Sequence, residues 1–169
     1  MQTIKRTYGF TLIEIVIAIS IIGVLAVFVN IQWPGTKISY SAEAEQVASD
    51  ARYAQALSMT QGVRFCLKIS GSTYQIIDSA TSTAVILGTG GTTITLGSGI
   101  SFGTLVPSGL TLLVFDGNGT PYSSSSTTCT TATAAAATAL SNAANLPVTA
   151  GGLTKTVVIS PETGRVTTQ

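Results

Sequence analysis

The side chains that could carry out chemistry in this sequence are few, and their spacing does not favour catalysis. The 169 residues include no histidine, so the commonest general base and the commonest protein ligand for metals are both missing. The many serine and threonine side chains have no histidine to activate them, and no serine–lysine arrangement stands out at a usable spacing. We therefore expect a protein that is not an enzyme and that holds no metal and no cofactor.

Two further ligand classes, cations and nucleic acids, are also not expected. The segment Asp116–Gly119 begins like a calcium loop, but Thr120 and Pro121 break the pattern that such a loop requires, so a β-turn is the better interpretation. Charged residues make up only 9% of the chain and the formal net charge is +1. No basic surface is therefore expected that could hold nucleic acid through its phosphates.

Cys66 and Cys129 are the two cysteines, and they could form one structural disulfide. They lie far apart in the sequence and lack the CxxC spacing of a zinc or redox site, so pairing is the better interpretation and two free thiols are the alternative. A disulfide indicates an oxidising compartment outside the cytoplasm. Cys66 shares a strand face with Arg64 and Lys68, opposite the expected core face, so Cys129 must approach from outside the core.

The apolar segment 10–33 is long enough to span a membrane as a helix. It would rise about 36 Å, more than the hydrocarbon thickness of a bilayer. Lys5 and Arg6 precede the segment, and Lys37 is the first charged residue after it. The positive-inside rule therefore leaves the N-terminus in the cytoplasm and the rest of the chain on the other side of the membrane.

Glu14 is the charged residue inside this apolar segment, and it needs a partner there. An unpaired carboxylate in the hydrocarbon region of a bilayer costs several kcal/mol. Cleavage after Gly9, the small residue between the charged and apolar segments, would leave a new α-amino group on Phe10 at the same membrane depth. That amine could pair with Glu14 of an adjacent subunit. The alternative is a simple signal-anchor helix in which Glu14 is tolerated near the membrane surface.

The segment 9–26, GFTLIEIVIAISIIGVLA, closely resembles the prepilin signature that type IV pilins and type II secretion pseudopilins share. The resemblance implies that a prepilin peptidase cuts after Gly9 and methylates Phe10, and that Glu14 aligns incoming subunits. It also implies a location in the bacterial inner membrane, with the head in the periplasm, before assembly into a pilus or pseudopilus. The implied partners are other pilin or pseudopilin subunits, the prepilin peptidase, the inner-membrane assembly platform and membrane lipid.

The resemblance also divides the chain into segments. Residues 1–9 would be a leader that is removed, residues 10–35 a transmembrane and assembly helix, and residues 36–169 a soluble head. Within the head, residues 121–150 are rich in serine, threonine and alanine and offer too little large apolar surface to fold alone. We expect them to form a low-complexity insertion that the disulfide attaches to the sheet.

The expected fold is α+β: a long N-terminal helix, half transmembrane and half amphipathic, whose amphipathic half packs on an antiparallel sheet. Residues 36–61 contain neither glycine nor proline, and apolar residues recur at helical spacing between Val47 and Leu57. Apolar and polar residues then alternate from 63 to 69, which is typical of a half-buried strand. Further strands are predicted at 73–77, 83–87, 93–96, 100–106, 110–115 and 155–159. A helix followed by strands is an α+β arrangement.

The head also resembles the minor pilins FimT and FimU and the H-type minor pseudopilin of type II secretion. The residues that carry this resemblance are Ala51, Arg52, Gly62, the strand 63–66, the turn 115–119 and the closing segment 157–166. The resemblance implies a structural subunit: a minor pilin in pilus biogenesis, twitching or DNA uptake, or alternatively a minor pseudopilin in protein secretion. A DNA-binding subunit at the pilus tip is a further alternative, because Gly164 and Arg165 match the start of a Gly-Arg-x-Arg motif that some FimT-like subunits use on DNA. Thr167 replaces the second arginine, so a turn is the better interpretation.

Overall fold

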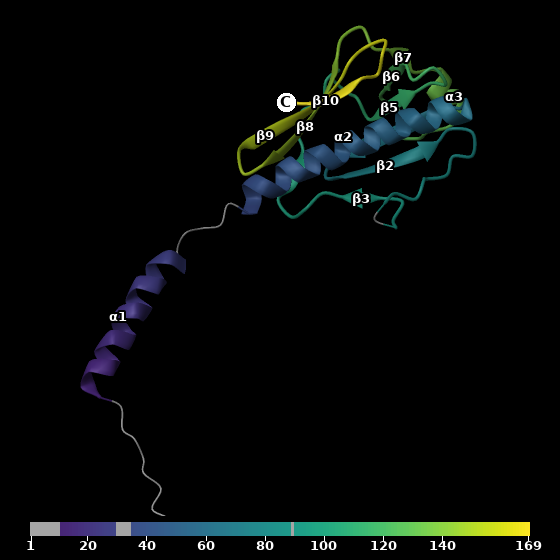
Figure 1. The fold of residues 1–169 in the computed structure, drawn as a ribbon. Helices are drawn as coiled ribbons and strands as arrows, with labels where there is room; N and C mark the ends of the chain where they lie inside the picture. Colours follow the sequence, from purple (N-terminus) through teal and green to yellow (C-terminus); the bar gives the residue numbers. More distant parts are fainter. Residues whose placement is uncertain (1–10, 30–34, 89) are drawn as a thin grey trace, which may run out of the picture. The chain divides into compact units, whose positions relative to one another are not determined.

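The computed structural model describes residues 11–29, 35–88 and 90–169, which belong to two compact units, Met1–Pro34 and Gly35–Gln169 (Figure 1). In the first unit the described residues form the helix α1 (Leu12–Val29). The second unit, the head, begins with the helix α2 (Gly35–Gln61), and antiparallel strands follow it. The α+β class predicted from the sequence is therefore confirmed.

α1 is apolar around its circumference. From Leu12 to Val24 its large apolar side chains are exposed, from 44% for Val16 to 81% for Leu12. Ser20 satisfies its hydroxyl within the helix, because Oγ donates to the Val16 carbonyl oxygen at 2.7 Å. A helix that is apolar on all sides needs lipid or other protein around it.

Across the described parts of the chain, no helix has both the length and the apolar character needed to cross a membrane.

α2 forms where the sequence predicts a helix, and it presents small side chains to the sheets. Its fully buried apolar residues are Ala44, Val47, Ala48, Ala51 and Ala54. Their short side chains let the helix backbone lie close to the strands. Gly62 ends the helix: its φ of +66° lies in the left-handed region that favours glycine, and its N–H donates to the Ser58 carbonyl oxygen at 2.9 Å.

The strands form two antiparallel sheets. Sheet A has the strand order β3-β2-β1-β5-β6-β7 and sheet B the order β10-β9-β8-β4. The bounds are β1 Phe65–Ser70, β2 Thr73–Asp78, β3 Ile94–Thr95, β4 Ile100–Phe102, β5 Leu112–Phe115, β6 Pro121–Ser124, β7 Thr138–Ala139, β8 Ala144–Ala150, β9 Leu153–Ile159 and β10 Val166–Thr168. α2 packs on strands of both sheets, on β1 and β5 of sheet A and on β8, β9 and β10 of sheet B (Figure 1).

Two hydrophobic clusters lie on opposite faces of sheet A. The face of sheet A toward α2 is here called the inner face. The larger cluster lies between this face, α2 and sheet B, and includes Phe65, Leu67 and Phe115. The smaller cluster lies on the outer face and consists of Cys66, Ile77, Leu112, Val114, Cys129 and Ala134. The sequence predicted a half-buried strand at 63–69, and for Cys66 this prediction is wrong. Cys66 is fully buried because a second layer covers the outer face.

The residues of that second layer lie within 121–150, a segment for which the sequence predicted no strands. This segment contains β6, the short helix α3 (Thr131–Ala135), β7 and β8. The segment is too poor in large apolar residues to fold alone, but it can fold on a sheet that supplies such residues. β8 pairs with both β9 and β4 and so lies inside sheet B.

In the structure the predicted strand 83–87 is reduced to an isolated bridge, and the predicted strand 100–106 ends early. In 83–87 only Ala84 forms an isolated bridge, to Ile77, and the chain then turns, with the N–H of Gly90 donating to the Leu87 carbonyl oxygen at 2.8 Å. In 100–106 the strand β4 ends at Phe102, and Val106 forms a separate bridge to Asn145. Gly103 interrupts the segment 100–106, so its apolar residues do not form a continuous ladder.

Candidate functional site

Glu14 is the acidic residue in the first turn of α1. Its side chain is exposed, and its N–H donates to the Thr11 carbonyl oxygen at 3.1 Å. The neighbouring side chains Ile13 and Ile15 are 63% and 54% exposed. The carboxylate therefore stands on an apolar surface, where a cationic partner would be valuable once that surface is covered.

The predicted cleavage and methylation site, Gly9 and Phe10, lies outside the described residues. The roles of Gly9, Phe10 and Glu14 stay predictions.

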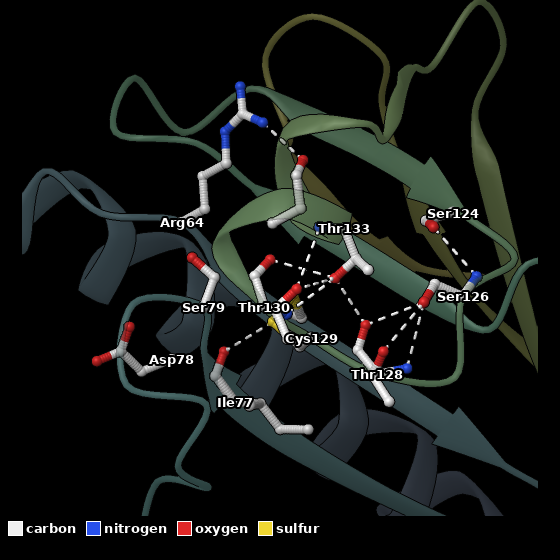
Figure 2. Close-up of a disulfide and its surroundings, with 12 residues drawn as sticks. Arg64, Ile77, Asp78, Ser79, Ser124, Ser126, Thr128, Cys129, Thr130 and Thr133 are labelled. Atoms are coloured by element: carbon white, nitrogen blue, oxygen red, sulfur yellow. Dashed lines mark hydrogen bonds between the residues drawn. A yellow bond between two sulfur atoms is a disulfide. The ribbon is translucent and has the colours of Figure 1, made fainter.

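Cys66 in β1 and Cys129, just before α3, form the predicted disulfide (Figure 2). Their Cα atoms lie 6.2 Å apart. Cys66 is 0% and Cys129 3% exposed. Cys129 reaches Cys66 on the outer face of sheet A, as the alternation of Cys66 with the core-facing residues of β1 predicted.

Arg64 connects the start of β1 to the segment that carries Cys129. Its Nη1 donates to the Ala134 carbonyl oxygen at 2.6 Å, at the end of α3 (Figure 2). Its guanidinium carbon lies 5.3 Å from the centre of the Tyr122 ring, within the range of a cation–π contact. The sequence placed Arg64 on the outer face but gave no sign of this contact, because nothing in 121–150 predicted a helix there.

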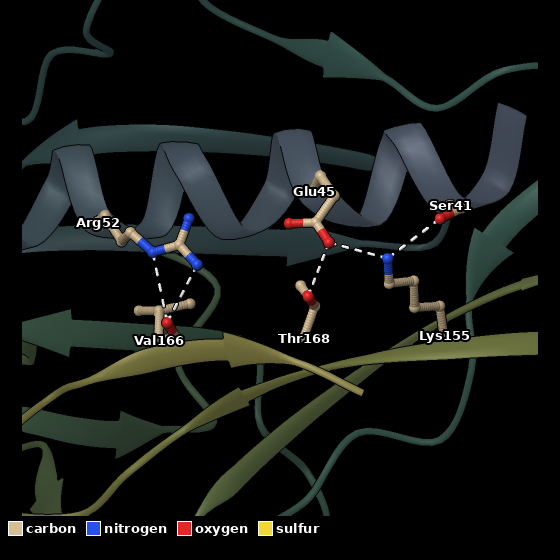
Figure 3. Close-up of polar contacts among 6 residues, drawn as sticks. All are labelled: Ser41, Glu45, Arg52, Lys155, Val166 and Thr168. Atoms are coloured by element: carbon tan, nitrogen blue, oxygen red, sulfur yellow. Dashed lines mark hydrogen bonds and ion pairs between the residues drawn. The ribbon is translucent and has the colours of Figure 1, made fainter. Parts of the chain in front are cut away.

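Polar side chains on α2 hold sheet B (Figure 3). Lys155 Nζ forms an ion pair with Glu45 Oε1 at 2.8 Å and donates to Ser41 Oγ at 3.0 Å. Thr168 Oγ1 also donates to Glu45 Oε1, at 2.7 Å. The hydrogen bond from Lys155, followed by that from Thr168, lowers the pKa of the Glu45 carboxyl below its usual value. Arg52 donates to the Val166 carbonyl oxygen from Nε at 3.3 Å and from Nη2 at 3.1 Å.

A buried carboxylate, Asp50, links α2 to sheet A. Asp50 is 7% exposed and Tyr74 is 1% exposed, and the Tyr74 hydroxyl donates to Asp50 Oδ2 at 2.6 Å. Gln46 Nε2 lies 3.1 Å from each carboxylate oxygen. Burial, and then the hydrogen bond to Asp50, raises the pKa of the Tyr74 hydroxyl far above its usual range. These contacts explain how Asp50 of α2 can be buried against sheet A. They give Asp50 a structural role and do not point to a catalytic or ligand-binding one.

The turn 115–119 and the closing segment 157–166 meet at Gln55 of α2. Gln55 Nε2 donates to the carbonyl oxygens of Gly119 and Thr163, both at 2.9 Å. A Cβ on Gly164 would lie 2.4 Å from the Gly119 carbonyl oxygen, and its φ is +64°, so this position suits glycine alone. A glutamine inside a helix pattern gave no signal of this junction.

Both segments of the junction have the turn geometry that the sequence predicted. Asp116 Oδ1 accepts from the backbone N–H groups of Asn118 and Thr120 at 2.9 and 2.8 Å, as in a turn closed by an aspartate side chain. Arg165 follows the second turn, and its side chain is exposed. DNA contact by Arg165 stays a prediction. In the described parts of the chain, no group of three or more acidic or cysteine side chains could hold a metal ion.

Comparison with known proteins gives two findings. A family model, the prokaryotic N-terminal methylation motif, matches residues 4–30. Among solved structures, the type IV minor pilin FimU of Pseudomonas aeruginosa is similar in two crystal forms. One has a TM-score of 0.52 and 14% identity, covering 79% of this chain and 90% of FimU, and the other a TM-score of 0.49 and 15% identity, covering 76% and 91%. No curated protein matches the sequence.

These findings show an N-terminal motif and a fold. A prepilin-type methylation motif lies at the N-terminus of the chain, and the first FimU crystal form shares the fold of the chain. At this level of identity the structural likeness speaks to the fold alone.

Proposed function

We propose that this chain is a minor pilin, a structural subunit without catalytic activity. In this proposal the prepilin peptidase cuts after Gly9 and methylates Phe10. The segment 10–33 holds the subunit in the bacterial inner membrane, with the head in the periplasm, and Glu14 then guides it into a type IV pilus. The observation that carries the proposal is the methylation motif at 4–30 on a chain with a pilin-like head.

The surface of α1 supports an assembly role for this region. Its exposed apolar side chains match a helix that is surrounded by lipid before assembly and by other helices afterwards. Glu14 is the charged residue among them. In lipid the lone carboxylate is costly, whereas beside the α-amino group of a neighbouring Phe10 it gains a partner of opposite charge.

We propose a pilus and not a type II secretion pseudopilus, because the first FimU crystal form, which shares the fold, is a type IV minor pilin. Deletion of the gene separates the two. Loss of surface pili or of twitching, with secretion intact, supports the pilus. Loss of secreted proteins with normal pili would instead assign the subunit to the type II secretion pseudopilus.

The proposed role of Glu14 is tested by replacing it with leucine. Glu14→Leu removes a carboxylate that has no partner in a lone subunit, so insertion into the membrane should be at least as efficient as for the native chain. In the filament the neighbouring amine would face leucine, and leaving one member of a buried ion pair alone typically costs about 3–5 kcal/mol. The measurement is the amount of this subunit in sheared filaments divided by the amount in membranes, and this ratio should fall sharply.

Ser20→Leu is the matched control, because it also replaces a polar side chain of α1 by leucine. Ser20 satisfies its hydroxyl on Val16 of its own helix, so no neighbouring subunit should depend on it. The filament-to-membrane ratio should stay near that of the native chain. An unchanged ratio for Glu14→Leu, or equal losses in both variants, would show that the carboxylate is not the assembly contact.

A further inference from the structure

Residues 125–137, here called the cap, form the layer that covers the outer face of sheet A. The residues under it, Cys66, Ile77, Leu112 and Val114, are at most 8% exposed. The cap side chains that pack on them are small: Cys129, Ala134 and Ala137. The apolar surface of this cluster therefore belongs mainly to the sheet, and the cap supplies little of it.

Few contacts hold the cap in place. Besides the disulfide, Arg64 donates to the Ala134 carbonyl oxygen at 2.6 Å (Figure 2). Thr131 Oγ1 donates to the Ser79 carbonyl oxygen at 3.1 Å. At the start of the cap, Thr111 Oγ1 donates to the Ser126 carbonyl oxygen at 2.7 Å. Arg64 provides the charged contact among these, and charged donors make the stronger hydrogen bonds.

The disulfide is closed off by the layer that it attaches. Cys66 is fully buried and Cys129 is 3% exposed, so a thiolate in solution cannot approach either sulfur along the S–S axis while the cap is closed. None of the residues in this outer cluster belongs to the larger cluster between α2 and the sheets. The cap therefore covers a cluster that is separate from the helix–sheet core.

We propose that the cap is a hinged cover that controls thiol–disulfide exchange at Cys66 and Cys129, with Arg64 as the residue that keeps it closed. The disulfide forms while the cap is open, and closure then shields it from reductants. Arg64 acts by position and touches no reacting sulfur. This inference does not depend on assembly into a filament.

The exchange needs an oxidant that carries a disulfide, either a protein or a small molecule. One cysteine thiolate attacks the oxidant's disulfide, which forms a mixed disulfide and releases one oxidant thiolate. The second cysteine thiolate attacks the cysteine sulfur of that mixed disulfide, which forms the Cys66–Cys129 bond and releases the other oxidant thiolate. Two electrons pass from the cysteine pair to the oxidant, and the two cysteine protons pass to solvent or to the released thiolates. Reduction by dithiothreitol is the reverse sequence.

The test measures how fast dithiothreitol reduces the disulfide in the full chain, held in detergent micelles at fixed pH, with thiol labelling as the readout. Arg64→Ala removes the hydrogen bond to Ala134 and the contact with Tyr122, so the open population should rise. Reduction should become faster on the order of tenfold or more. Arg64→Lys keeps a cationic donor and should restore part of the protection.

Arg52→Ala is the matched control. Arg52 also donates to a backbone carbonyl oxygen, but that oxygen belongs to Val166 in β10, so Arg52 connects α2 to sheet B instead of to the cap. Its loss should leave the reduction rate near that of the native chain. Equal acceleration by both variants, or none by Arg64→Ala, would overturn the proposal.

A second measurement on the native chain covers the case in which Arg64→Ala does not fold. The reduction rate is followed in urea below the unfolding transition. Opening of the cap alone exposes little surface, so the rate should depend only weakly on urea. A dependence as steep as that of global unfolding would show that the whole head must unfold before the disulfide reacts, and would overturn the proposal.

Discussion

The two faces of sheet A are both buried, but by different means. The inner face packs large side chains such as Phe65, Leu67 and Phe115 against α2 and sheet B. The outer face is covered by a segment whose contributing side chains are alanines and one cysteine, and a covalent bond attaches that segment. The comparison shows that a strand can be buried on a face without a regular hydrophobic partner, when a disulfide keeps a poorly apolar segment in place.

The largest expected loss of stability comes from substitutions in β5, whose neighbouring residues lie on opposite faces of sheet A. Leu112 and Leu113 are adjacent in β5, both fully buried, with Leu113 on the inner face and Leu112 on the outer face. Leu113→Ala should lower the free energy of unfolding by about 3–5 kcal/mol, because the surrounding core cannot close the cavity. Leu112→Ala should cost about 2–3 kcal/mol, because the cap can settle into the space. Chemical denaturation of both variants measures the difference, and a larger loss for Leu112→Ala would reverse our ranking of the two faces.

Removal of the disulfide should have the next largest effect. The cysteines are 63 residues apart in sequence, and replacing both in Cys66→Ala/Cys129→Ala should lower the free energy of unfolding by about 2–4 kcal/mol. Amide hydrogen exchange should speed up first in the cap and least in α2. A melting temperature and an exchange pattern equal to those of the native chain would contradict this expectation. They would mean that the small cap side chains keep the cap on the outer face without the disulfide.

The smallest expected effect concerns the polar contacts that join α2 to sheet B. The pKa of Glu45 is lowered in the folded chain, so this group stabilises the fold at a pH above its ordinary pKa of 4.5. The contribution is lost as the pH falls through the lower, folded value. The melting temperature of the native chain should therefore exceed that of Glu45→Gln slightly at neutral pH, and the gap should close as the pH falls below the ordinary pKa of 4.5. A gap that stays constant with pH would assign the effect to packing.

The inner face was predictable from the sequence, because its signals are local. The helix over 36–61 has favourable composition and ends at Gly62, and the alternation from 63 onward predicts β1. The disulfide was predictable because two cysteines far apart in the sequence, without CxxC spacing, favour pairing. Its approach from the outer face follows from the alternation of side chains along a strand.

The cap and β8 could not be predicted, because each depends on residues far away in the sequence. The alanines of the cap are buried only because β1, β2 and β5 supply Cys66, Ile77, Leu112 and Val114 beneath them. β8 contains Pro147, which argues against a central strand because proline lacks an N–H donor. In the structure Pro147 lies one residue beyond the last β4 pair, Phe102 with Val148, so the ladder with β4 does not need that donor.

The prepilin identity is the central claim, and the N-terminus of the mature protein tests it most directly. The protein should be isolated from the cells that make it, and its intact mass and N-terminal peptide measured by mass spectrometry. We predict a chain that begins at Phe10 and carries one methyl group on its α-amino nitrogen. A mature chain that still begins at Met1, or that begins at any residue other than Phe10, would contradict the claim.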